Sequence, residues 1–296
     1  MNSATPCKQT RYVIITPVRD EALHIEETIK CVTQQTITPT EWVIVDDGST
    51  DGTGGILDRY AGLYSWIQPL HKANRGFRDA AVGAVQAFLD GFHSLKSADW
   101  EFIVNLDGDL GFDPAYFEKC FQQFDQDAKL GIGGGTVYCL TATGATHIEP
   151  SPDFHVRGAT KIYRRACWEA IEGLAAAPGW DTLDEVKAHM AGWCVRSFAS
   201  LLVLHKRPTG AVGGSWRDSV KNGHCDYFLG YQPMFMFLKC LRRAFHKPFL
   251  VSGVGHLYGF IRGYIDRRPQ VADAALIRYV RRQQMRRLLR MDSTWK

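Results

Sequence analysis

The stretch FIVNLDGD, residues 102–109, decides the fold class that we predict for this chain. Its first five residues are typical of a buried strand, and Asp107 and Asp109 follow that strand directly with one glycine between them. Two carboxylates at a strand end can hold one hard divalent cation, Mg²⁺ or Mn²⁺, and the ion can bridge to diphosphate oxygens. Such triplets also occur by chance on solvated turns. The position of this triplet directly after a strand is therefore what favours a metal site here.

Alternating strands and helices precede this stretch. The strands are expected at Tyr12–Thr16, Trp42–Val45 and Trp66–Leu70, and the helices at Glu21–Val32, Thr53–Ala61 and Phe77–Phe92. Alternation at this spacing predicts an α/β fold, a mainly parallel sheet with helices on both faces. Ligands of such sheets bind beyond the carboxyl ends of the strands.

Polar motifs follow two of these strands, as Asp107 to Asp109 follows the fourth. The first strand leads into Pro17-Val18-Arg19-Asp20, and the second leads into Asp46-Asp47-Gly48-Ser49. The second motif serves in part as a strand-to-helix turn with a helix cap. Two adjacent acids exceed what a cap needs, so one of them can accept hydrogen bonds from a base or a ribose.

The second half of the chain is less regular. We expect a strand at Val156–Tyr163, a helix from about Asp184 and a last strand at Leu201–His205. No linker rich in Pro, Gly or Ser is visible, so the prediction is a catalytic domain over residues 10–220 and an extension over residues 221–296.

Composition and the lack of targeting signals further limit the class of protein that we predict. The chain has 296 residues, 45% hydrophobic and 22% charged, which are globular values. Its eight cysteines form no CxxC pair, which favours cytosolic thiols over a disulfide frame or a zinc site. The polar start lacks a signal-peptide run, and no apolar stretch has the length of a membrane span.

The extension is strongly basic. From Cys240 to Lys296 there are 13 Lys+Arg and 3 Asp+Glu, a net of +10, whereas the whole chain carries +4. Residues 272–291 are expected to form one helix with apolar side chains on one face and arginines on another. The apolar set is Ile277, Val280, Leu288 and Met291, and the arginines are Arg278, Arg282, Arg286 and Arg290.

Two interpretations of this helix stay open: it lies on anionic lipid, or it is a solvated helix packed on the protein. Upstream, Tyr227–Leu241 and Pro248–Ile265 are apolar and aromatic, and we interpret the second as interfacial or re-entrant because it contains His256 and Arg262. Nucleic acid is not expected as a partner, because no nucleic-acid motif accompanies the arginines.

Three motifs together resemble the inverting glycosyltransferases of family two, which have the GT-A fold. They are Pro17-Val18-Arg19-Asp20-Glu21, Asp46 to Thr53 and Asp107-Gly108-Asp109, and the resemblance covers about residues 10–210. It implies a nucleotide-sugar donor, most often a UDP-sugar, and a transfer assisted by Mn²⁺ or Mg²⁺ that inverts the anomeric centre.

The resemblance also implies roles for individual residues. The donor's nucleotide would be bound by Pro17, Val18, Asp20, Asp46 and Asp47. Asp107 would contact the ribose or the metal, Asp109 would bind the metal, and His205 would complete the metal shell, as a late histidine does in some GT-A enzymes. Arg78, close to a helix N-terminus, suits a phosphate, and Lys206 or Arg207 can hold the leaving diphosphate.

The resemblance further implies a carboxylate base, typically the Asp of a Glu-Asp pair about eleven residues before a Gly-Trp pair. Counting back from Gly192-Trp193 reaches Asp181, where the usual preceding Glu is replaced by Trp180. Asp184 and Glu185 are the alternatives, and Asp184 can also simply favour the first turn of its helix.

These expectations combine into one prediction. The chain is a metal-dependent glycosyltransferase that adds a sugar to a lipid-linked or polysaccharide acceptor, in the cytoplasm at the inner face of an anionic membrane. A nucleotidyltransferase is the first alternative, although Thr16 to Glu21 lacks the expected Gly-rich basic loop. A non-catalytic membrane-bound scaffold with the same fold is the second.

Overall fold

The computed structural model describes residues 10–76, 82–140, 144–148, 152–207, 214–245 and 249–295. The chain divides into two compact units. Unit 1 comprises Met1–Gly173 and Trp193–Lys206, and unit 2 comprises Leu174–Gly192 and Arg207–Lys296. We describe each unit by itself. The predicted domain boundary at residue 220 stays a prediction.

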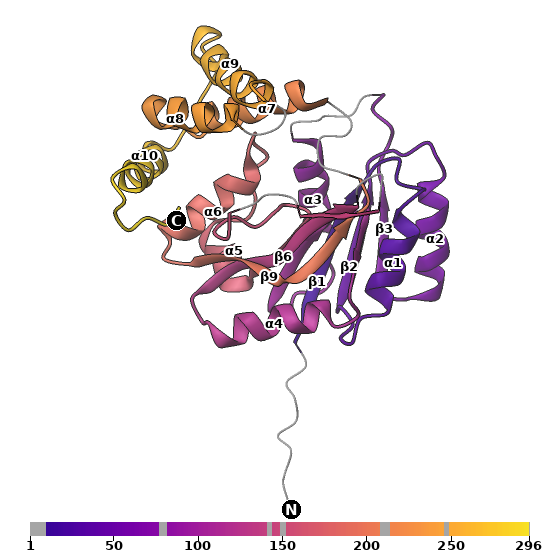
Figure 1. Cartoon of the computed structure of the whole chain (residues 1–296). Helices are drawn as coiled ribbons and strands as arrows, with labels where there is room; N and C mark the ends of the chain where they lie inside the picture. Colours follow the sequence, from indigo (N-terminus) through magenta and orange to yellow (C-terminus); the bar gives the residue numbers. More distant parts are fainter. Residues whose placement is uncertain are drawn as a thin grey trace, which may run out of the picture. The chain divides into compact units, whose positions relative to one another are not determined.

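Unit 1 is built on one nine-stranded sheet with the order β3-β2-β1-β4-β8-β6-β9-β5, and β7 pairs with β6 (Figure 1). Four strands form its parallel half: β1 (Tyr12–Val18), β2 (Glu41–Asp46), β3 (Ile67–His71) and β4 (Phe102–Leu106). All four were expected from apolar runs within two residues of these bounds. The predicted fold class is confirmed.

The other half of the sheet is mixed. Antiparallel pairs link β8 (Thr160–Arg164) to β4 and to β6 (Leu130–Leu140), while β9 (Cys194–His205) runs parallel to β6. Two short strands, β5 (Leu110–Phe112) and β7 (Thr146–Ile148), join β9 and β6 in antiparallel fashion. The expected strand at Leu201–His205 is the end of the longer β9, and the expected strand at Val156–Tyr163 begins later, at Thr160.

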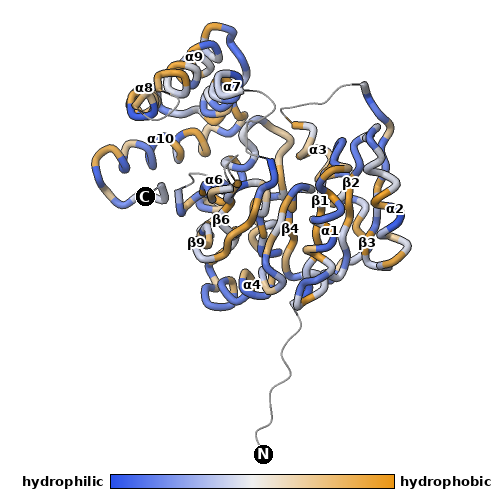
Figure 2. The backbone as a smooth tube through the Cα atoms, turned by 45° about the vertical axis from the view of Figure 1, so that its right-hand side comes forward, coloured by the Kyte–Doolittle hydropathy of each residue, from blue (hydrophilic) through white to orange (hydrophobic). Residues whose placement is uncertain are grey.

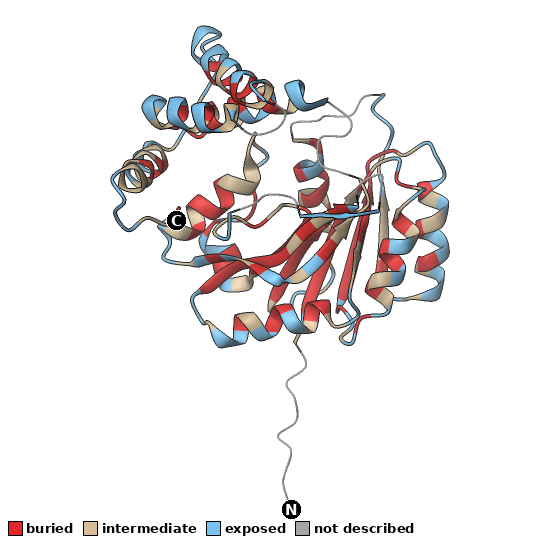
Figure 3. Cartoon of the chain, viewed as in Figure 1, coloured by how far each residue is buried: buried red, intermediate tan, exposed pale blue. Residues whose placement is uncertain are grey.

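Helices cover both faces of the sheet because side chains alternate along its buried strands. They are α1 (Ile25–Thr33), α2 (Thr53–Leu63), α3 (Gly83–Ser94), α4 (Tyr116–Gln126) and α5 (Arg165–Ala170). On one face the Tyr12 ring lies 5.2 Å from the Phe117 ring of α4. On the other face α3 is so close that a β-carbon at Gly91 would lie 2.7 Å from Ile15. The buried core in red in Figure 3 follows these strands.

Two of the expected helices begin elsewhere in the described residues, and one observed helix was not expected. The first helix begins at Ile25 and not at Glu21, because the backbone of Asp20 is left-handed (φ +55°) and residues 20–22 bond to the next loop. Helix α3 begins at Gly83 within the described residues, and Phe77–Ala81 lie outside them. The sequence analysis missed α4, although its buried residues fall at helical spacing.

Unit 2 is helical in its described residues, with α6 (Trp180–Met190), α7 (Gly214–Phe228), α8 (Pro233–Ala244), α9 (Val251–Ile265) and α10 (Ala274–Leu288). The expected helix from Asp184 starts earlier, at Trp180. The expected helix at 272–291 is α10, which starts after Asp273 because that carboxylate accepts the N–H groups of Ala275 and Leu276. None of the helices described in the structure is long and apolar enough to cross a membrane.

The apolar face of α10 packs within unit 2. Leu276 and Val280 are buried, and Ile277 lies against Gly230, where an added β-carbon would sit 2.8 Å from its side chain. The Arg281 guanidinium donates to the Gly230 carbonyl oxygen at 2.8 Å. Of the two interpretations of this helix, the observed packing corresponds to a helix packed on the protein.

Candidate metal and nucleotide site

The Asp107-Gly108-Asp109 triplet forms the connection between β4 and β5. Its first N–H donates to the Ala159 carbonyl oxygen at 2.8 Å, and the Asp109 carbonyl accepts the Lys206 N–H at 3.0 Å. The middle residue has to be small, because a β-carbon at Gly108 would lie 2.7 Å from Cγ1 of Val18. Buried neighbours therefore fix the backbone that carries the two carboxylates.

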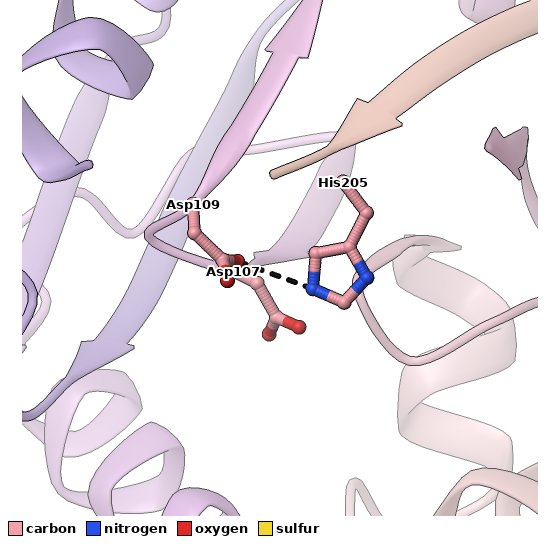
Figure 4. Close-up of side chains that lie close together, drawn as sticks. All are labelled: Asp107, Asp109 and His205. Carbon is pink, nitrogen blue, oxygen red and sulfur yellow. Dashed lines mark ion pairs between the residues drawn. The ribbon is translucent and has the colours of Figure 1, made fainter. Parts of the chain in front are cut away.

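His205 completes a cluster with these carboxylates. It is the last residue of β9 and pairs with Leu110 of β5, which follows Asp109 directly. Its Nε2 lies 3.4 Å from Oδ1 of Asp109. One ligand atom from each of Asp107, Asp109 and His205 lies within 4.8 Å of the others, and Figure 4 shows the three side chains converging. The three residues predicted as metal ligands are thus brought together.

The chemistry of this donor set fits a divalent ion. Carboxylate oxygens are preferred by Mg²⁺ and Mn²⁺, and a neutral imidazole nitrogen is a better ligand for the transition metal of the two. Asp109 is 3% exposed, and a buried carboxylate needs a positive partner. A metal ion at this position would supply that charge.

Lys206 lies next to this cluster in the chain. Its ammonium pairs with the Glu27 carboxylate of α1, and burial lowers the pKa of Lys206. The structure thus places this predicted diphosphate contact in an ion pair with α1. Arg207, the other predicted diphosphate contact, is the last residue of the described range 152–207.

Hydrogen bonds join the loops after β1 and β2 to each other. Asp20 receives the Thr50 N–H at 2.8 Å on its carboxylate and donates its own N–H to Ser49 Oγ at 2.9 Å. In return, the Asp51 carboxylate accepts the Ala22 N–H at 2.9 Å. The Asp20 carboxylate therefore shapes the loop. Pro17 is half-buried in β1, and Val18 is buried against Gly108.

Asp46 is engaged inside the same loop. Its Oδ1 accepts the Ser49 N–H at 2.8 Å, and its Oδ2 lies 3.2 Å from Nδ1 of His71, at the end of β3. The other nitrogen of His71 lies 3.0 Å from Asp58. The pKa of His71 is raised, most strongly by the hydrogen bond to Asp58 and less strongly by the hydrogen bond to Asp46. Asp46, predicted as a nucleotide contact, thus holds its turn and the end of β3.

The Asp47 carboxylate is buried and is surrounded by cations. Nη2 of Arg75 donates to both of its oxygens, at 2.9 and 2.7 Å. The Lys72 ammonium lies 3.5 Å and the Arg19 guanidinium 3.8 Å from it. These three partners were missed in the sequence analysis, which concentrated on Arg78, a residue outside the described part of the chain. Positive side chains directly after a strand were the signal that could have revealed them.

A close backbone approach fixes the segment that carries Lys72 and Arg75. Gly48 has φ +79°, and a β-carbon there would lie 2.5 Å from Cα of Asn74. The Asn74 side chain accepts from Arg19 at 3.0 Å and from the Gly76 N–H at 2.8 Å. The geometry of the Asp47 site therefore depends on glycine at position 48.

The predicted catalytic acids lie in unit 2, whereas the cluster of Asp107, Asp109 and His205 lies in unit 1. Asp181 is in the first turn of α6 and half-buried. Asp184 is 2% exposed, and its Oδ1 accepts the N–H of Glu185, itself buried, at 2.6 Å. The two candidates therefore differ sharply in their access to solvent.

Solved structures share the fold of this chain. The mannosyltransferase PcManGT from Pyrobaculum calidifontis, in complex with GDP-Man and Mn²⁺, matches with a TM-score of 0.55 at 18% identity, over 86% of this chain and 71% of that chain. S. aureus TarS 1–349 in complex with UDP matches with a TM-score of 0.53 at 16% identity, over 87% and 72%. The fold is a GT-A fold.

The sequence comparison identifies the family. The model of the family described as glycosyl transferase family 2 matches residues 13–171, more than half of the chain. The chain therefore belongs to glycosyl transferase family 2. The uncharacterized glycosyltransferase EpsJ of Bacillus subtilis (strain 168) is 28% identical over 137 residues, which are 46% of this chain and 37% of EpsJ. The match thus spans little more than a third of that relative.

Proposed function

We propose that the protein is a metal-dependent inverting glycosyltransferase that uses a nucleotide-sugar donor. The observation that carries the proposal is the convergence of Asp107, Asp109 and His205 at one edge of a GT-A sheet. A Mn²⁺ or Mg²⁺ ion held there would offset the negative charge of the departing diphosphate. The family and the fold support this reaction class.

The donor's nucleoside is assigned to the edge formed by the loops after β1, β2 and β3. Asp47 is a buried acceptor, and Arg75 and Lys72 beside it supply donors, so a base that offers both donors and acceptors has partners there. One structural neighbour holds GDP-Man and another holds UDP, so both nucleotides fit the fold. UDP is the nucleotide that we expect, because the family resemblance most often implies a UDP-sugar.

The general base is assigned to Asp181. A base has to reach the acceptor hydroxyl and take its proton as the oxygen attacks the anomeric carbon. The bond between that carbon and the diphosphate breaks in the same step, and the diphosphate leaves with the nucleotide. Asp181 is half-buried and accessible, whereas Asp184 is buried and already accepts a backbone N–H group. Asp184 is the second candidate.

The acceptor is proposed to be a hydroxyl of a lipid-linked or polysaccharide glycan. The basic, aromatic segment after residue 220 supports a location at an anionic membrane surface, on the cytoplasmic side as the sequence predicts.

The proposal is tested by incubating the protein with UDP-, GDP-, dTDP- and CMP-linked sugars and measuring the nucleotide released, with Mn²⁺, with Mg²⁺ and with EDTA. Slow release from one donor class, lost in EDTA, is expected even without the acceptor. Release of pyrophosphate from a nucleoside triphosphate would indicate the nucleotidyltransferase alternative. No turnover of a folded sample, even after glycan acceptors are added, would indicate the scaffold alternative.

A further inference from the structure

The inner sides of helices α8 and α9 carry charged groups beside the buried apolar side chains Met236, Cys240 and Phe260. The interior between α7, α8 and α9 holds a charged cluster: Asp226 lies 2.5 Å from the Lys239 ammonium and 2.7 Å from Nε2 of His256. Nη1 of Arg243 lies 3.2 Å from the other ring nitrogen of His256, and burial lowers the pKa of His256. Asp226 and His256 are 7% and 1% exposed.

The outward faces of the same two helices are apolar. Each exposes large hydrophobic side chains at helical spacing, and two more occupy the turn between the helices; all are between 42% and 73% exposed. They are Met234, Phe237, Leu238 and Leu241 on α8, Phe245 directly after it, Phe249 and Leu250 in the turn, and Val254, Tyr258, Ile261, Tyr264 and Ile265 on α9. Figure 2 shows the hydrophobic segments on both helices, and Figure 3 shows that these helices carry exposed stretches.

Small residues on α9 allow a very close approach to α7. A β-carbon at Gly259 would lie 2.1 Å from the Val220 carbonyl oxygen, and one at Gly263 would lie 2.3 Å from the Tyr227 ring. Gly255 extends this stripe at a spacing of four residues. Such small-residue stripes, together with polar groups turned inward and apolar groups turned outward, are the pattern of helices that face lipid.

We propose that the α8–α9 hairpin inserts its outward face shallowly into one leaflet of an anionic phospholipid membrane. Helices of 12 and 15 residues are about 18 and 22 Å long, too short for a hydrocarbon core of about 30 Å, so they lie along the interface. Residues 233–268 contain 7 Lys+Arg and 1 Asp, which complements an anionic surface. Exposed Arg242 and Arg262 flank the two apolar stripes.

This inference deepens the proposed function, on which its biological meaning rests, but its test needs neither donor nor metal. Sedimentation with sucrose-loaded vesicles of phosphatidylcholine containing phosphatidylglycerol should show strong binding, and pure phosphatidylcholine should bind at least tenfold less. The double variants Phe237→Ser/Leu241→Ser and Tyr258→Ser/Ile261→Ser should each lower binding at least tenfold.

Control variants distinguish lipid binding by the α8–α9 hairpin from binding by other surfaces and from dimer formation. Leu23→Ser/Leu63→Ser removes two exposed apolar residues of unit 1 and should leave vesicle binding unchanged. Circular dichroism melts confirm that each variant is folded. Loss of binding in Arg278→Gln/Arg282→Gln but not in the hairpin variants would assign the contact to α10 and overturn the proposal. A lipid-free dimer that the hairpin variants dissociate would assign the surface to a second copy and overturn it as well.

Discussion

Nε2 of His205 lies 3.4 Å from Oδ1 of Asp109, at the junction of two strands that are distant in sequence. The antiparallel pairing of Leu110 with His205 creates this contact, because it aligns the end of β9 with the residue after Asp109. Strand pairing thus brings His205, the proposed third metal ligand, next to the Asp-Gly-Asp triplet.

His205→Ala should raise the Mn²⁺ concentration needed for half-maximal donor turnover by about tenfold, since one of three ligands is lost. The change in Mg²⁺ requirement should be smaller, because Mg²⁺ prefers oxygen ligands. Turnover titrated with each ion measures both effects. An unchanged Mn²⁺ requirement would remove His205 from the site.

Gly108→Ala should destabilise the protein by about 1–3 kcal/mol, because the new methyl group would overlap Val18. It should also weaken metal-dependent nucleotide binding by moving the carboxylates. The double variant Gly108→Ala/Val18→Ala should recover part of the stability in urea unfolding. Equal stability of the single and double variants would show that Val18 is not the obstacle.

Arg75→Ala should weaken nucleotide binding and lower stability by about 1 kcal/mol, because Asp47 loses two charge-assisted hydrogen bonds at a side chain that is partly exposed. Arg75→Lys should restore more of the stability than of the binding, since it keeps the charge but not the guanidinium geometry. Calorimetric titration with UDP and urea unfolding provide the two measurements. Wild-type affinity in Arg75→Ala would place the nucleoside elsewhere.

His71 should make a pH-dependent contribution to stability. The pKa of its imidazole is raised by Asp58 and Asp46, so the folded state favours the protonated ring. That contribution is fully present below the unfolded value of about 6.5 and is lost as the pH rises through the folded pKa. The Tm difference between the wild type and His71→Asn should therefore be larger at pH 5.5 than at pH 9. A difference independent of pH would contradict the assignment.

Asp181→Asn should leave nucleotide binding within about twofold of the wild type and reduce transfer by at least two orders of magnitude, the scale of general-base catalysis. Asp184→Asn serves as the matched comparison on the same helix. Calorimetry with UDP and a transfer assay separate binding from chemistry. Full transfer by Asp181→Asn and none by Asp184→Asn would move the base to Asp184.

Local signals in the sequence were sufficient to predict the strands of the parallel half of the sheet and the carboxylates at its edge. Runs such as WVIV at Trp42–Val45 are short, apolar and β-branched, and acids follow them at once. The strand direction of β8 was beyond such signals, because it depends on pairing between distant segments, whereas α4 was missed although its apolar residues fall at helical spacing. Positive side chains after the strands are visible in the sequence, but the pairing of Arg75 with Asp47 depends on the close approach of Asn74 to Gly48.

The charged cluster on the inner side of α8 and α9 also required the structure. The apolar residues of these helices are visible in the sequence, but the burial of Asp226 and His256, with Lys239 partly buried beside them, depends on how three helices pack. The sequence indicated an interfacial segment at Pro248–Ile265 and also directed attention to the arginines of α10. The apolar side chains Leu276 and Val280 of α10 are buried in its own unit.

The central claim is that Asp107, Asp109 and His205 hold a metal ion through which a nucleotide donor binds. The most direct test is a thermal-shift titration with UDP, GDP, dTDP and CMP, each with and without Mn²⁺, on the wild type, Asp109→Ala and the control Asp125→Ala. The control replaces an exposed acid of α4. A nucleotide at about 100 times its Kd should stabilise the fold by about 2.7 kcal/mol. We expect one nucleotide to raise the Tm of the wild type and of Asp125→Ala only when Mn²⁺ is present, and none to raise that of Asp109→Ala. A metal-dependent shift that persists undiminished in Asp109→Ala would contradict the claim.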